Sequence, residues 1–202
     1  MTYTILATTA LSTAWPWYVV RASGIVALLL LGLVTLSGIG MVTGLTYRFI
    51  EPLQAWALHR AIAIALALSS LTHIGFLLLD TFAPYSLKNV LVPFSVHYEH
   101  SRLFGIGVGS LYNALGILGA YLLAIVLVSS LLVIDTKKKL WQWLHFLSYP
   151  LMVMVFFHVL FLGTDFKHGA VRLVWLVSGL ILLAGLTSRL RRSGTLSPPR
   201  DN

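Results

Sequence analysis

The stretches ALHRAIAIALALSSLTHIGFLLLD (residues 57–80) and WQWLHFLSYPLMVMVFFHVLFLG (residues 141–163) decide how this chain folds. Each is long enough to cross a bilayer, which takes about 20 helical residues. Each also contains two histidines: His59 and His73 are 14 residues apart, and His145 and His158 are 13 apart. An imidazole in lipid is costly unless it faces a bundle interior and has a partner. The two pairs therefore predict a functional site inside a membrane bundle.

The composition is that of an integral membrane protein. Of the 202 residues, 58% are hydrophobic and 10% are charged, and the mean hydropathy is +0.88. This predicts an all-α, multi-pass helix bundle. The five expected spans lie at about residues 18–45, 55–79, 103–134, 141–162 and 171–186. We expect residues 1–17 to be an external tail, 18–190 the membrane domain and 191–202 a cytoplasmic tail. The absence of cysteine excludes disulfides and thiolate ligands.

The basic residues predict an external N-terminus and a cytoplasmic C-terminus, because Lys and Arg concentrate in cytoplasmic loops. In that orientation the cytoplasmic side has Arg48, Arg60, Lys137, Lys138, Lys139, Arg189, Arg191, Arg192 and Arg200. The outer side has only Arg21, Lys88, Arg102, Lys167 and Arg172. The excess of positive charge is thus loop charge, and no nucleic-acid partner is expected. The second and fourth spans then run in the same direction, which brings their histidines level in pairs.

Heme iron accepts axial imidazoles, and a porphyrin is an apolar disc that suits a bundle interior. We therefore predict two b-type hemes at depths about 20 Å apart, one held by His59 and His145 near the cytoplasm, the other by His73 and His158. Two side chains fourteen residues apart on a helix point within about 40° of each other, whereas two that are thirteen apart point about 140° away from each other. Pro150 lies between His145 and His158, and a kink or bulge there is expected to correct the phase.

Several neighbouring residues have two possible roles. Arg60 is equally compatible with pairing to a heme propionate and with anchoring its helix at the membrane surface. His97, His100 and His168 lie in external loops, where they either gather a metal substrate or are simply solvated. Ser129 and Ser130 are expected to bond back to their own helix. A zinc site fits less well, because histidines at opposite ends of one helix are too far apart to share an ion.

The histidine frame resembles a known family. The segments LHRAIAIALALSSLTH (58–73), LVPF (91–94) and WQWLHFLSYPLMVMVFFHVLFLGTD (141–165) are similar to the ferric reductase-like transmembrane domain. That domain is shared by NADPH oxidases, ferric-chelate reductases and the heme subunit of the periplasmic methionine sulfoxide reductase system. The resemblance covers about residues 18–190, with five expected spans where many relatives have six. It implies the same ligand sets, His59 with His145 and His73 with His158.

Together these features predict a di-heme b-type cytochrome of the cell membrane, an electron-transfer (oxidoreductase) subunit. It would relay electrons from a cytoplasmic flavin reductase or a quinol to an external or periplasmic acceptor. We expect no flavin or NAD(P) site in this chain, because only a short tail follows residue 190, and no catalytic side chain beyond the heme ligands. The alternative is a heme-free transporter or scaffold whose histidines move protons or transition metals.

Overall fold

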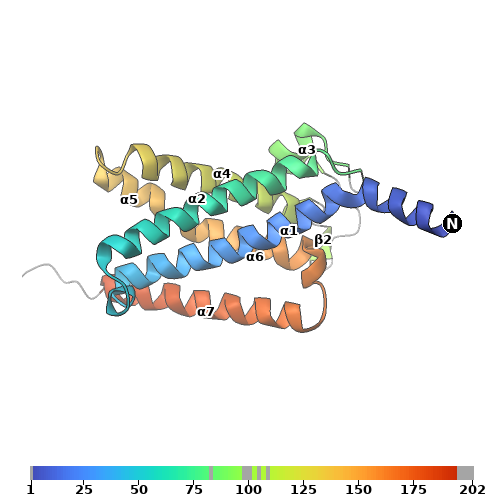
Figure 1. Cartoon of the computed structure of the whole chain (residues 1–202). Coiled ribbons are helices and arrows are strands. Elements are labelled where there is room, and N and C mark those ends of the chain that lie inside the picture. The colour runs from blue at the N-terminus through green and yellow to red at the C-terminus, as the bar shows by residue number, and fades with distance from the viewer. Residues whose placement is uncertain (1, 82–83, 97–101, 104–105, 108–109, 195–202) are drawn as a thin grey trace, which may run out of the picture.

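The computed structural model describes residues 2–81, 84–96, 102–103, 106–107 and 110–194 and shows an all-helical bundle (Figure 1). Its long helices are α1 (Thr2–Thr43), α2 (Pro52–Leu77), α4 (Leu111–Leu132), α5 (Lys138–Phe146), α6 (Ser148–Leu162) and α7 (Gly169–Gly194). Among the described residues, five segments are long and apolar enough to cross a membrane: Ala14–Thr43, Pro52–Leu77, Leu111–Leu132, Lys138–Leu162 and Gly169–Ser188. The prediction of an all-α bundle with five spans is confirmed.

Two of the expected element boundaries were wrong. The helix expected from residue 103 begins at Leu111, and the preceding chain forms a short antiparallel pair, β1 (Arg102–Leu103) with β2 (Ile106–Gly107). Gly105, Gly107 and Gly109 disfavour a helix in that stretch. The first helix begins at Thr2 instead of residue 18, so the segment ahead of the expected span continues the same helix, with Pro16 inside it. Short connections complete the chain: η1 (Thr46–Arg48), α3 (Leu87–Leu91) and η2 (Thr164–Phe166).

The helices pack as two main pairs. Helix α1 lies along α2, α4 lies along α6, and α7 lies against α1. Buried leucines from three spans meet in the middle, among them Leu28, Leu66 and Leu151. Large apolar side chains such as Leu29, Leu68 and Leu180 instead point outward and are 61%, 61% and 66% exposed. An apolar outer surface of this kind is expected of helices that contact lipid.

The fourth span is interrupted between its two histidines. Helix α5 ends at Phe146 and α6 begins at Ser148, so Leu147 separates them. The amide of Leu147 donates to the carbonyl of Leu144 over 3.1 Å, a tighter turn than the α-helical one. Pro150 has no N–H for the carbonyl of Phe146, and its ring crowds that carbonyl. The break therefore falls one turn before the proline and lies between His145 and His158.

Candidate functional site

The histidines toward the η2 end of the bundle each donate a hydrogen bond to the backbone of a neighbouring helix. His73 Nδ1 lies 2.9 Å from the carbonyl oxygen of Val20, and His158 Nδ1 lies 2.8 Å from that of Tyr112. A carbonyl oxygen only accepts, so Nδ1 of each ring is the protonated nitrogen. The Nε2 atom of each neutral ring is then left with an unshared electron pair. This is the tautomer that a histidine uses when it binds a metal through Nε2.

A glycine makes room for each of these two rings. Gly24 lies four residues after Val20, and Gly116 lies four residues after Tyr112. A Cβ atom at Gly24 would come 2.9 Å from His73 Nδ1, and one at Gly116 would come 2.5 Å from His158 Nδ1. Both distances are shorter than van der Waals contact, so a side chain at either position would push the ring away. Helices α1 and α4 thus use the same combination of a carbonyl and a glycine one turn later.

The other two histidines are oriented by serines. Ser37 Oγ donates to the carbonyl of Val34 at 2.8 Å and lies 2.8 Å from His59 Nδ1. Because the hydroxyl has one hydrogen, Ser37 accepts the hydrogen bond from His59, which gives this ring the same tautomer. Gly38 lies beside it, where an added Cβ would be 3.4 Å from His59 Cε1.

Ser130 has the corresponding position beside His145. Its Oγ lies 3.2 Å from His145 Nδ1 and accepts a hydrogen bond from Trp141 Nε1, also at 3.2 Å. The expectation that Ser130 bonds back to its own helix was therefore wrong, because the histidine and the indole use its hydroxyl instead. Ser129 does bond back, donating to the carbonyl of Val126 at 3.1 Å.

The rings of His59 and His145 face each other across the bundle. Their centroids are 6.3 Å apart, and their planes are inclined at 53°. Two imidazoles on opposite sides of one metal ion have centroids about 6 Å apart, since a metal–imidazole bond is about 2.0 Å long and the nitrogen lies about 1 Å from the ring centre. The structure therefore brings this sequence-predicted pair to the separation that a shared metal requires.

His73 and His158 line one cavity of about 400 Å³. This volume is within the range of cofactor and ligand sites, roughly 300–1,000 Å³. The cavity is bounded by residues of α1, α2, α4 and α6, and Leu31, Leu66 and Leu151 form part of its apolar wall. His59 and His145 are not among its lining residues. The arrangement is an apolar space with two imidazoles, which suits a flat apolar cofactor with a central metal.

The mouth of this cavity contains an ion pair that the sequence did not predict. Arg21 of α1 donates to both carboxylate oxygens of Asp165 in η2, with an Nε–Oδ2 distance of 3.2 Å. The two residues are 144 positions apart, and nothing in the local sequence pairs them. Lys167 also lines the mouth. The bidentate pair links the middle of α1 to the segment that joins α6 and α7.

Arg60 and His168 do not line the histidine cavity. The guanidinium of Arg60 lies over the indole of Trp56, 4.6 Å from the ring centroid, and Arg60 does not line the cavity. This position agrees with an anchor at the membrane surface. His168 is exposed just before α7. His97 and His100 lie outside the described residues.

The sequence predicted the histidines and missed the residues that orient them. Gly24 and Gly38 are 14 residues apart, as are His59 and His73, and Gly116 and Ser130 repeat that spacing in α4. The signal available was a pair of small residues on the preceding span whose spacing equals that of the histidines for His59 and His73 and differs by one residue for His145 and His158. Val20 and Tyr112 act through their backbone, so their side chains gave no indication.

Comparison with models of known families, with characterised proteins and with solved structures gives no match for this chain. Within the described part of the chain, no three or more His, Asp or Glu side chains come together where they could hold a metal ion. The histidines instead occur as two pairs.

Proposed function

We propose that the chain is a di-heme b-type membrane cytochrome of the ferric reductase-like kind. It relays electrons from a cytoplasmic flavoprotein or a quinol to an acceptor at the outer face. The observation that supports this is the orientation of the imidazoles: His59, His73 and His158 each donate from Nδ1 to an acceptor on a neighbouring helix. Each therefore offers Nε2 to a metal, while its Nδ1 hydrogen bond fixes the ring.

The residues present fit two hemes. His59 and His145 would hold one iron, and His73 and His158 would hold the other beside the apolar cavity of about 400 Å³. When bound, each heme supplies a one-electron carrier whose potential depends on its axial ligands and surroundings. Two imidazoles would hold each heme, which would then supply electron transfer and offer no open site for oxygen or substrate. The reaction with the final acceptor would therefore take place at the protein surface or on a partner.

The chain's own residues orient the imidazoles and shield the cavity from water. The carbonyls of Val20 and Tyr112 and the hydroxyl of Ser37 accept the Nδ1 hydrogens, which makes the bound imidazoles stronger donors to the iron. Leu31, Leu66 and Leu151 keep water from the middle of the cavity. Lys167 adds positive charge at its mouth, beside the Arg21–Asp165 ion pair, and would stabilise a heme propionate there.

The test is to purify the protein from the membrane, record its reduced-minus-oxidised spectrum and count hemes per chain by pyridine hemochrome. We expect two b-type hemes. His73→Ala should remove one and leave the other, because His59 and His145 do not depend on that ring. His168→Ala is the matched control, since this exposed histidine does not line the cavity.

A folded protein that contains no heme would overturn the proposal. So would a His73→Ala variant that keeps both hemes. Proton or metal flux through reconstituted vesicles without a visible spectrum would instead establish the transporter alternative.

A further inference from the structure

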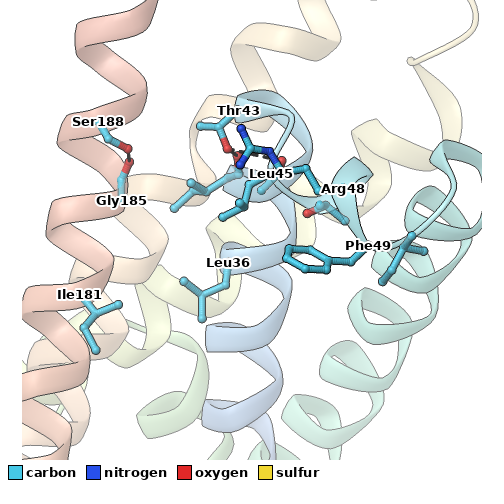
Figure 2. A pocket seen from close by; sticks show the side chains of 12 residues that line it. Leu36, Thr43, Leu45, Arg48, Phe49, Ile181, Gly185 and Ser188 are labelled. Atoms are coloured by element: carbon cyan, nitrogen blue, oxygen red, sulfur yellow. Dashed lines mark hydrogen bonds between the residues drawn. The ribbon is translucent and has the colours of Figure 1, made fainter.

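A second cavity, of about 660 Å³, lies at the other end of α1 from the mouth of the histidine cavity (Figure 2). Its walls come from three segments: the end of α1, the connection from α1 to α2 that contains η1, and the last turns of α7. None of its lining residues lines the cavity beside His73 and His158. It is a separate site and needs an explanation of its own.

The walls change from apolar to polar toward the ends of the spans in α1 and α7. Leu36, Ile39 and Ile181 lie within the spans and form the apolar part. The polar part is formed by Thr43, Thr46, Arg48 and Ser188, which lie at or just beyond the ends of the spans Ala14–Thr43 and Gly169–Ser188. Figure 2 shows Leu36 and Ile181 in the apolar part and Thr43, Arg48 and Ser188 around the polar end. A ligand that fits this cavity has an apolar tail in the bilayer and a polar head at its surface.

The charge of the lining favours an anionic head. Arg48 is exposed, and the twelve residues around the cavity include no Asp, Glu or His. Guanidinium groups bind phosphate oxygens through charge-assisted hydrogen bonds, and hydroxyls such as that of Thr46 can add to them. In the sequence, three arginines follow Ser188 within four residues: Arg189, Arg191 and Arg192.

The same lining argues against a quinol as the occupant. Quinol oxidation releases protons as well as electrons, and a site for it needs a group that accepts them. Arginine stays protonated at all physiological pH values and cannot do so. The hydroxyls of Thr43 and Ser188 donate to carbonyls of their own helices, at 2.9 Å and 2.7 Å. A phosphate needs no such acceptor.

We propose that this cavity binds one anionic glycerophospholipid. Its phosphate lies on the guanidinium of Arg48, and an acyl chain follows the wall formed by Leu36, Ile39 and Ile181. Basic pockets between spans at the cytoplasmic surface bind such headgroups, and the predicted topology places this end there. The lipid would fix the end of α1, whose Ser37 and Gly38 contact His59 on the opposite side. The proposal does not depend on heme and is tested separately from it.

The experiment uses the purified full-length protein, stripped of lipid in a neutral detergent. Phosphatidylglycerol and phosphatidylcholine with the same acyl chains are added separately, and native mass spectrometry counts the lipids retained. Heme is read from the absorption spectrum of the same samples. Inorganic phosphate and a short-chain quinone are the two further probes. The variants are Arg48→Gln, Arg48→Lys and Ile181→Trp, and Lys139→Gln is the control, an exposed charge predicted on the same side of the membrane.

We expect one phosphatidylglycerol per chain, retained at least about tenfold better than phosphatidylcholine, because a hydrogen bond to a charged group is worth about this factor or more. Arg48→Gln should abolish the preference, and Arg48→Lys should keep most of it. Ile181→Trp should lower retention by filling the apolar part, and Lys139→Gln should change nothing. Inorganic phosphate alone should not compete.

Three results would overturn the proposal. The first is equal retention of both lipids by the unmodified protein. The second is an unchanged preference in Arg48→Gln. The third is saturable quinone binding that displaces phosphatidylglycerol and is lost in Ile181→Trp, which would make the cavity a quinone site.

Discussion

We expect Gly116→Ala to displace His158 and to remove the heme that His73 and His158 would share. A Cβ at this position would lie 2.5 Å from His158 Nδ1 and 2.6 Å from Cε1. Ordinary contact begins at 3.4 Å, so the ring must retreat by roughly 0.9 Å. The same movement stretches the 2.8 Å hydrogen bond to the carbonyl of Tyr112. Binding sites tolerate displacements of about 0.5 Å, so this change exceeds the tolerance.

The chain provides a graded series for this test. At Gly24 the Cβ would lie 2.9 Å from His73 Nδ1, so that ring must retreat by roughly 0.5 Å. At Gly38 the nearest atom of His59 is 3.4 Å away, so no movement is needed. Gly32, on the same helix as Gly24 and Gly38, has no atom within 4 Å of an added Cβ and is the matched control. Gly32→Ala should stabilise the helix slightly, by up to about 1 kcal/mol.

The assay is heme content per chain together with a potentiometric titration of the reduced spectrum. We expect the affinity for one heme to fall about 10–100-fold or more in Gly116→Ala, the magnitude typical of a lost hydrogen bond to a ligating histidine. Gly24→Ala should have a smaller effect on the same heme, and Gly38→Ala and Gly32→Ala should keep both. Two hemes with unchanged potentials in Gly116→Ala, or equal losses in Gly116→Ala and Gly32→Ala, would refute the reasoning.

Two further substitutions test other parts of the site. Ser37→Ala removes the acceptor for His59 Nδ1 and should weaken binding of the heme between His59 and His145 about 10–100-fold, measured by heme retention during purification. Thr35→Ala is the control, because the Thr35 hydroxyl bonds to its own helix. Equal heme retention in the two variants would contradict the role of Ser37. Pro150→Ala allows the carbonyl of Phe146 to be bonded and α5 to continue into α6, which turns His145 away from His59. Its heme content should fall while its helicity by circular dichroism stays equal or rises, and a full complement of hemes would show that Leu147, not the proline, sets the break.

The helix bundle could be predicted from the sequence because the length of an apolar segment depends only on residues that are consecutive in the chain. A segment of about 20 apolar residues has no stable alternative in a bilayer to a helix that satisfies its own backbone. The expected span at 103–134 began too early, because the helix starts only at Leu111, after Gly105, Gly107 and Gly109. Hydropathy alone does not include the low helix propensity of glycine. The histidines were found for a related reason: a polar ring inside an apolar segment is conspicuous without any knowledge of its neighbours.

The sequence by itself determined the all-helical membrane bundle, its five spans and the histidines placed in pairs along two of them. Only the tertiary structure decided that His59 faces His145 at 6.3 Å and that carbonyls, serines and glycines of α1 and α4 orient the rings. It also decided the pairing of Arg21 with Asp165 and the cavity around Arg48. The physical reason is that spans and their polar exceptions depend on residues near in sequence. Ring orientation, ion pairs and cavities depend on helix packing, which joins residues that are distant in the chain.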